Sequence, residues 1–116
     1  MAESPDKIAA LADIARALDR LGAAYAVVGG VAVGIRSGVP RATLDTDIAV
    51  QSTAHRKALI DALAAAGLRF TGEFAHSLNF RHGSGEPVRI VVDREFDPMI
   101  DRAETMEMAG LRLSAS

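Results

Sequence analysis

The order of helix-like and strand-like segments predicts an α/β (α+β) fold in which a mixed β-sheet packs against helices. The chain has 116 residues, enough for one hydrophobic core and too few for two, so residues 1–116 are expected to form a single domain. Helical and strand patterns alternate in the first half, and a hairpin pattern follows. A hairpin joins antiparallel strands, so the sheet is expected to be mixed rather than purely parallel.

The first predicted elements are a helix and a short strand. Ser4 suits the N-cap and Pro5 the first helical position, and apolar residues then recur at helical spacing as far as Leu21. Gly22 predicts the end of this helix. Residues 25–28 form a short apolar run, which predicts a buried strand.

Three further elements are predicted before residue 68. Residues 31–37 are rich in alanine and valine and predict a short helix, and the second half of residues 41–50 predicts a strand. Ser52 or Thr53 then caps another helix, which ends at Gly67.

The second half of the chain begins with a predicted hairpin. Residues 74–82 and 87–93 flank Gly-Ser-Gly-Glu at residues 83–86, which suits a four-residue loop. The last predicted elements are a short helix at residues 96–103 and strands at residues 106–108 and 111–113.

Composition excludes several functions. The chain has no cysteine, so disulfides, cysteine-ligated zinc, iron–sulfur clusters and thiol catalysis are ruled out. The formal net charge of -2 argues against a broadly basic surface for nucleic acid, although a local basic patch remains compatible with it. Because no apolar run is long enough to span a membrane and the first residues do not resemble a signal peptide, we expect a cytoplasmic protein without membrane contact.

Two consecutive glycines, Gly29 and Gly30, follow the first predicted strand. Glycine lets the backbone approach a ligand closely, and the free N–H groups at the start of the next helix can bind phosphate oxygens. A Gly-Gly pair by itself is also explained by a plain tight turn, so both interpretations stay open.

Two acids, Asp45 and Asp47, are separated by a single residue in the next predicted strand. Alternate residues of a strand point to one face, so both carboxylates project together and repel each other. A divalent cation such as magnesium relieves that repulsion. The alternative is a pair of solvated carboxylates on an edge strand, but the apolar residues 48–50 that follow favour burial.

The same face of this extended segment carries Arg41 and Thr43. A guanidinium, a hydroxyl and two carboxylates are therefore expected to converge on one site. Arg41 can neutralise a phosphate or orient a carboxylate through two hydrogen bonds. A surface ion pair with Asp45 is an equally good interpretation.

Together these features resemble the active-site signature of the polymerase-β-type nucleotidyltransferase superfamily. The likeness rests on the residues around Gly29 and Gly30 and on the Arg-X-Thr-X-Asp-X-Asp pattern of residues 41–47. That second pattern is similar to the AbiEii-like branch, which belongs to abortive-infection and toxin–antitoxin systems. Residues 25–50 carry most of the resemblance, and a weaker likeness continues to about Gly110.

The resemblance implies a minimal nucleotidyltransferase fold and a magnesium-dependent transferase. Such an enzyme moves a nucleoside monophosphate from a nucleoside triphosphate to an acceptor: an RNA, a protein hydroxyl or a small molecule. Asp45 and Asp47 would be catalytic and hold the magnesium, and the nucleotide would bind at Gly29, Gly30, Arg41 and Thr43. A partner protein or a second copy of the chain is a further expected partner.

The sequence departs from the family at the third carboxylate, which the family usually carries on a neighbouring strand. Asp93 is the only acid in residues 87–93 and is the candidate for this catalytic position, although it comes at the strand's end. Arg89 or Val91 can instead occupy the place of the acid, and Asp93 can be a turn residue or helix cap. The alternative function is therefore a catalytically degenerate module that binds a nucleotide or a partner. A third alternative is a structural or oligomerising domain with solvated acids.

Basic residues of the predicted hairpin form one more candidate feature. Arg81, His82 and Arg89 can form a small patch suited to the phosphates of a nucleotide or RNA. Scattered surface arginines are the competing interpretation.

Overall fold

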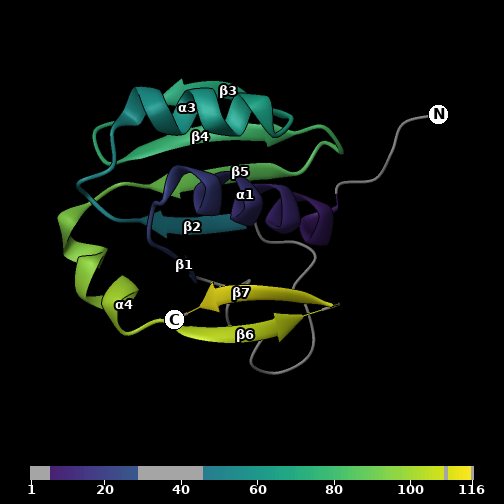
Figure 1. Cartoon of the computed structure of the whole chain (residues 1–116). Helices are drawn as coiled ribbons and strands as arrows, with labels where there is room; N and C mark the ends of the chain where they lie inside the picture. Colours follow the sequence, from purple (N-terminus) through teal and green to yellow (C-terminus); the bar gives the residue numbers. More distant parts are fainter. Residues whose placement is uncertain (1–5, 29–45, 109, 116) are drawn as a thin grey trace.

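A computed structural model of the chain describes residues 6–28, 46–108 and 110–115. In this part of the chain, two longer helices cover one face of a seven-stranded sheet (Figure 1). The helices are α1 (Lys7–Leu21), α3 (Arg56–Ala65) and the short α4 (Asp97–Asp101), which follows the 3-10 turn η1 (Arg94–Phe96). The strands are β1 (Tyr25–Val28), β2 (Thr46–Val50), β3 (Leu68–Glu73), β4 (Ser77–His82), β5 (Pro87–Val91), β6 (Glu104–Met108) and β7 (Leu111–Ala115).

The sheet is mixed, as the hairpin pattern predicts. Its strand order is β3-β4-β5-β2-β1-β7-β6. β1 runs parallel to β7 and β2 runs parallel to β5, whereas the other neighbouring pairs are antiparallel. The coarse prediction of an α+β fold with a mixed sheet against helices is therefore confirmed.

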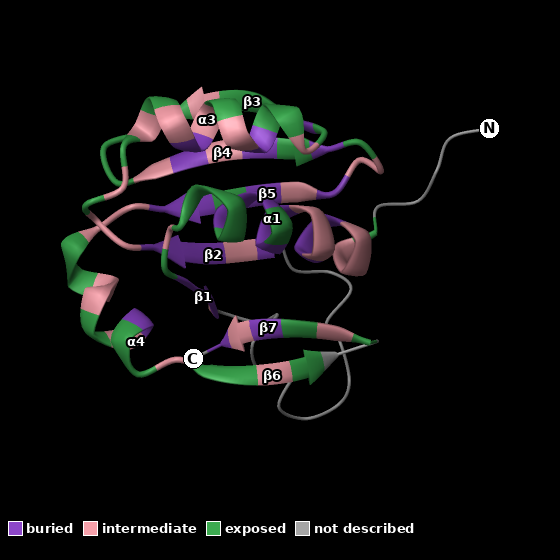
Figure 2. Cartoon of the chain, in the orientation of Figure 1, coloured by how far each residue is buried: buried purple, intermediate pink, exposed green. Residues whose placement is uncertain are grey.

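The main core lies between the sheet and the two longer helices. Alternate strand residues such as Val27, Ile48 and Ile90 point toward α1 and α3 and are buried (Figure 2). A smaller cluster on the opposite face joins Ala26 and Ala49 to Ile100 of α4. The two faces of β2 are thus packed differently, and α4 covers the opposite face at β1 and β2.

The structure corrects the predicted start of the first helix. Asp6, and not Ser4, is the N-cap of α1, because its Oδ1 accepts a hydrogen bond from the backbone N–H of Ala9 at 3.0 Å. Ser4 lies outside the described residues. The predicted end is confirmed, since Gly22 adopts a left-handed conformation with φ of 73°.

The predicted cap of the next described helix is also wrong. α3 starts after His55, which makes no side-chain capping bond, and neither Ser52 nor Thr53 caps it. Ser52 instead bonds to Asp97 through its backbone N–H and its hydroxyl, at 2.9 and 2.6 Å. The Ser52 side chain therefore fastens α4 to the end of β2 rather than starting a helix.

Strand β3 has no counterpart in the sequence-based prediction. Only Leu68 of its six residues is buried, so the strand shows no apolar alternation. The hairpin of β4 and β5 and the closing strands β6 and β7 are confirmed. The helix predicted at residues 31–37 lies outside the described residues. No helix of the described chain is both long and apolar enough for a membrane crossing.

Candidate functional site

Two of the predicted site residues, Asp47 and Asp93, lie in the described part of the chain. The other five are Gly29, Gly30, Arg41, Thr43 and Asp45, which lie outside it. The geometry below therefore concerns Asp47, Asp93 and the residues that surround them.

Asp47 lies near the start of β2, between β1 and β5. Its neighbours in the strand, Thr46 and Ile48, are buried on the helix side, so Asp47 projects from the opposite face of the sheet. Val28 is its partner across β1, and the chain continues directly from Val28 into Gly29 and Gly30. The strand that carries Asp47 thus begins beside the point where the glycine pair follows β1.

Arg89 of β5 lies opposite Asp47 in the parallel register. Its Nη2 is 3.3 Å from Oδ2 of Asp47, and the two side chains are 54% and 25% exposed. Val91, the other residue that the sequence leaves open for this place, is instead paired with Ala49 and buried. A guanidinium, and not a carboxylate, therefore faces Asp47 from the neighbouring strand.

The structure does not bring Asp93 to Asp47. Asp93 comes four residues after Arg89, roughly 13 Å along an extended chain. Its Oδ1 accepts a hydrogen bond from the backbone N–H of Glu95 at 2.9 Å, and its Oδ2 is 3.5 Å from Nδ1 of His76. These contacts are those of the N-cap of η1, so the alternative interpretation as a helix cap fits its geometry.

The described residues alone do not complete a magnesium site, and Asp45, the other predicted ligand, lies outside them. No group of three or more His, Cys, Asp and Glu side chains comes together within residues 6–28, 46–108 and 110–115. Asp47 is the one predicted metal ligand among them, and the positive charge of Arg89 faces it. Magnesium prefers several oxygen ligands, so these residues do not supply a donor set for it.

A buried polar cluster that the sequence did not reveal holds the start of β2. The hydroxyl of Thr46 donates to Oε2 of Glu86 at 2.9 Å, and Nζ of Lys7 donates to the same oxygen at 2.6 Å. Glu86 is only 2% exposed, so the ion pair is shielded from water. This cluster fixes the residue beside Asp47 to α1. Glu86 belongs to the predicted four-residue loop at residues 83–86, and no sequence signal distinguishes it from a solvated loop residue.

His82 belongs to the helix side of the sheet and not to the predicted basic patch. Its Nε2 is 2.6 Å from Oδ2 of Asp13, and its Nδ1 accepts the backbone N–H of Ser84 at 3.1 Å. Since Nδ1 accepts, Nε2 carries the proton and donates to Asp13. The patch predicted from Arg81, His82 and Arg89 therefore loses its histidine.

Asp97 is the described acid near the sheet whose pKa is clearly displaced. The hydroxyl and backbone N–H of Ser52 donate to its carboxylate, and these bonds hold the pKa of Asp97 below its usual value. Asp97 is therefore ionised at neutral pH. It serves as an anchor between α4 and β2.

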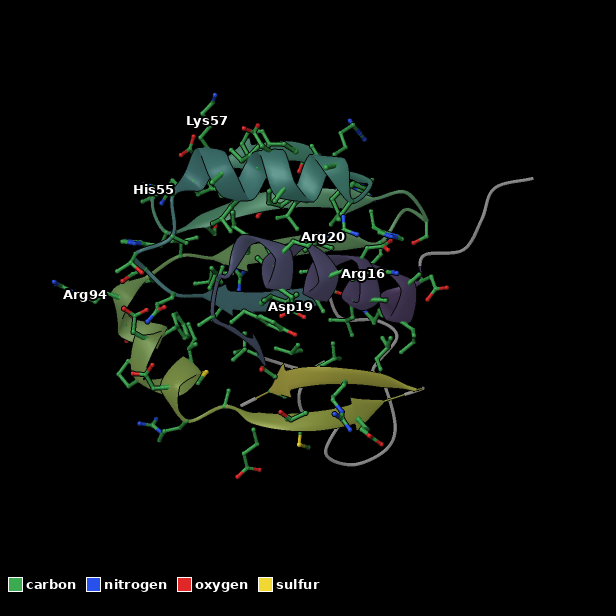
Figure 3. All side chains as sticks on the ribbon, in the orientation of Figure 1. Arg16, Asp19, Arg20, His55, Lys57 and Arg94 are labelled. Carbon is green, nitrogen blue, oxygen red and sulfur yellow. The ribbon has the colours of Figure 1, made fainter. Side chains whose placement is uncertain are left out.

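A hollow of about 520 Å³ lies on the other side of the sheet, between α1 and α3. Its lining combines small residues such as Ala17 and Ala62 with Arg16 and Arg20, which project from α1 (Figure 3). Because Asp47 projects from the opposite face, this hollow is not part of the predicted site.

Comparison with protein-family models found no match to this sequence, and comparison with curated proteins found none either.

Proposed function

We propose that this chain is a nucleotidyltransferase-type domain that binds a nucleoside triphosphate beside Asp47 and does not transfer the nucleotide efficiently. The observation that carries the proposal is Arg89, whose guanidinium lies 3.3 Å from the Asp47 carboxylate. A third carboxylate would add negative charge and attract divalent cations. The positive charge of an arginine instead offsets one negative charge of the site. A guanidinium can also hold phosphate oxygens itself through two hydrogen bonds.

The glycine pair adds to this proposal. β1 ends at Val28 across from Asp47, and Gly29 and Gly30 follow in the chain. The sequence pattern thus supplies a candidate phosphate-binding turn, and Arg89 supplies a positive charge on the neighbouring strand. The nucleotide remains the expected small-molecule ligand, and a partner protein or second copy remains an expected partner.

A second candidate function is the magnesium-dependent transferase itself, acting on RNA, a protein hydroxyl or a small molecule within a toxin–antitoxin system. The observation in its favour is the rigid start of β2. Thr46 separates Asp45 from Asp47 in the sequence, and its hydroxyl bonds to the buried Glu86. A fixed strand keeps catalytic carboxylates in one geometry, which transfer chemistry requires.

Binding and transfer have to be measured separately to test the proposal. Calorimetry with each of the four nucleoside triphosphates, in magnesium and in EDTA, measures affinity, and labelled nucleotide measures transfer. We expect binding without transfer, and a clear loss of affinity in Arg89→Ala. If the parent chain transfers the labelled nucleotide and Asp47→Asn abolishes this transfer, the second candidate function is supported instead. Absence of nucleotide binding in both buffers would overturn both.

Arg89→Asp sharpens the test because it places a carboxylate opposite Asp47. In this variant we expect nucleotide binding to require magnesium. Arg112→Asp makes the same charge change on β7, at an exposed position three strands away from β5, and should leave binding unchanged. If both variants respond alike, overall charge and not the position of Arg89 decides nucleotide binding.

A further inference from the structure

A row of three arginines crosses the face of the sheet opposite α1 and α3. Arg69 of β3 is paired with Arg81 of β4, and Arg89 lies on β5. Their strand neighbours Phe80, Val88 and Ile90 are buried toward the helices, so the arginine side chains project from the opposite face. We call Arg69, Arg81 and Arg89 the arginine row.

Two members of the row, Arg81 and Arg89, border a hollow of about 150 Å³. Thr71, Asn79, Arg81, Pro87 and Arg89 contribute to its lining. Asn79 is the register partner of Arg89. It lies on β4, between β3, which carries Arg69, and β5, which carries Arg89. The hollow is therefore polar and positively charged.

Asn79, which lines this hollow, has an unsatisfied acceptor. Its Oδ1 is buried and has no hydrogen-bond partner in the structure. A buried acceptor without a donor is destabilising, so a ligand hydroxyl would gain that hydrogen bond once the Asn79 amide turns its Oδ1 toward the hollow.

The arginines keep donors for a ligand. Arg81 donates through Nη1 to the carbonyl oxygen of Gly85 at 2.8 Å, and Arg89 donates through Nη2 to Asp47 at 3.3 Å. A guanidinium has five N–H donors, so these bonds leave others on both residues. Arg69 and Arg81 also face each other as like charges, which destabilises a strand pair, and a bound anion removes that repulsion.

We propose that the arginine row and Asn79 bind single-stranded RNA, with phosphates on the arginines and a ribose hydroxyl on Asn79. Arg69 and Arg89 lie two strands apart and are offset by two residues along the strands, because Arg81 pairs with Pro87, so they are roughly 12 Å apart. The row is therefore wider than one phosphate group and suits a phosphate chain. The 2′-hydroxyl of RNA is the donor that DNA lacks. Binding uses neither magnesium nor the transfer reaction, so it goes beyond the proposed nucleotide site, with which it shares Arg89.

Fluorescence anisotropy with a labelled ten-nucleotide RNA, in EDTA and at low salt, tests the proposal. Arg81→Ala and Arg89→Ala should each raise the Kd about tenfold or more, because each removes a charge-assisted contact. Each should also make the negative slope of log K against log salt shallower by about 0.7, because one phosphate contact is lost. The same oligonucleotide as DNA should bind several-fold more weakly, and Asn79→Leu should remove that difference.

Arg20→Ala is the matched control. It removes the same charge from α1 on the helix side of the sheet (Figure 3) and should leave RNA binding unchanged. Thermal melting identifies a variant that is not folded, and in that case Arg81→Gln keeps polar donors for Gly85 while removing the charge. An equal loss in Arg20→Ala, equal affinity for DNA and RNA, or absence of binding would overturn the proposal.

Two variants separate this inference from the nucleotide site. Asp47→Asn removes the carboxylate that faces Arg89 and should leave RNA binding intact or strengthen it. If the second candidate function holds, nucleotide binding depends on magnesium and the same variant should weaken it.

Because Arg89 serves both sites, a nucleoside triphosphate should compete with the RNA in the parent chain. Arg81 belongs to the row alone, so Arg81→Ala should weaken RNA binding and leave nucleotide binding unchanged. If Arg81→Ala weakens both alike, the row is part of the nucleotide site and the RNA assignment is wrong.

Discussion

The two faces of the sheet differ in how far their charged side chains are exposed to solvent. On the face covered by α1 and α3, Lys7 and Glu86 form an ion pair whose side chains are only 10% and 3% exposed. On the opposite face, Arg69, Arg81 and Arg89 remain exposed to solvent. Among the described residues, both faces carry charge, and the buried ion pair lies on the covered face.

Burial decides what a charged group can do. A buried charge has lost its water and needs a fixed partner, so it contributes to the structure of one state. An exposed guanidinium keeps its hydration and can exchange partners, so it is available to a ligand. This difference predicts that substitutions on the covered face change stability, whereas substitutions in the arginine row change binding.

Glu86→Ala should have the largest effect on stability. It leaves Lys7 charged, buried and without its partner, and it removes the acceptor of the Thr46 hydroxyl. Breaking a buried pair in this way lowers the free energy of unfolding by about 3–5 kcal/mol. Urea denaturation measures the change.

Glu104→Ala is the control for that prediction, because Glu104 is exposed on β6. Its expected change is within about 0.5 kcal/mol. A small loss in Glu86→Ala would show that Lys7 reaches water once Glu86 is removed, and the contrast between the two faces would then be weaker than proposed.

His82→Ala should have the next largest effect. It removes the partner of Asp13 and leaves the backbone N–H of Ser84 without its acceptor. Losing these bonds should lower the free energy of unfolding by about 1–3 kcal/mol, again measured with urea. His55→Ala, at an exposed position without a capping bond, should cost about 0.5 kcal/mol or less. Equal losses in the two variants would show that the bonds of His82 to Asp13 and Ser84 do not stabilise the fold.

The elements that could be predicted from the sequence are those with local signals. The strand at residues 25–28 is an apolar run, and Gly22 marks the end of α1 because its positive φ suits glycine. Edge strand β3 could not be predicted, because Leu68 is its one buried residue and its sequence shows no alternation of apolar and polar residues. Local patterns predict central elements better than exposed edges.

The candidate site was predictable only in part, because its key contact depends on strand register. Arg89 and Asp47 are 42 residues apart in the sequence. The sequence left both Arg89 and Val91 open as the residue in the place of the acid. Only the pairing of β2 with β5 decides that Arg89 faces Asp47. Register is set by packing of the whole sheet, which a short motif does not contain.

Ser52→Ala tests, through the pH dependence of stability, the hydrogen bonds that hold α4 to the end of β2. Ser52 donates two hydrogen bonds to Asp97 and holds its pKa below 3.8. A lowered pKa stabilises the folded chain above the ordinary pKa, and this contribution is lost as the pH falls through the lower folded-state value. The stability gap between parent and Ser52→Ala should therefore be full at pH 7 and shrink below about pH 4. Denaturation curves at both pH values measure the gap, and a constant gap would show that the Asp97 charge is not involved.

Arg69→Ala should have the smallest effect on stability and separates the faces most directly. Its side chain is exposed opposite Arg81, and removing one of two facing like charges should raise the free energy of unfolding by a few tenths of a kcal/mol, about 0.2–0.5. The gain should fade in high salt, because salt screens repulsion between exposed charges. Arg69→Lys keeps the charge and should show no gain. If Arg69→Ala instead lowers the free energy of unfolding by more than about 1 kcal/mol, Arg69 stabilises the fold. The contrast between a stabilising covered face and a ligand-binding arginine row would then be wrong.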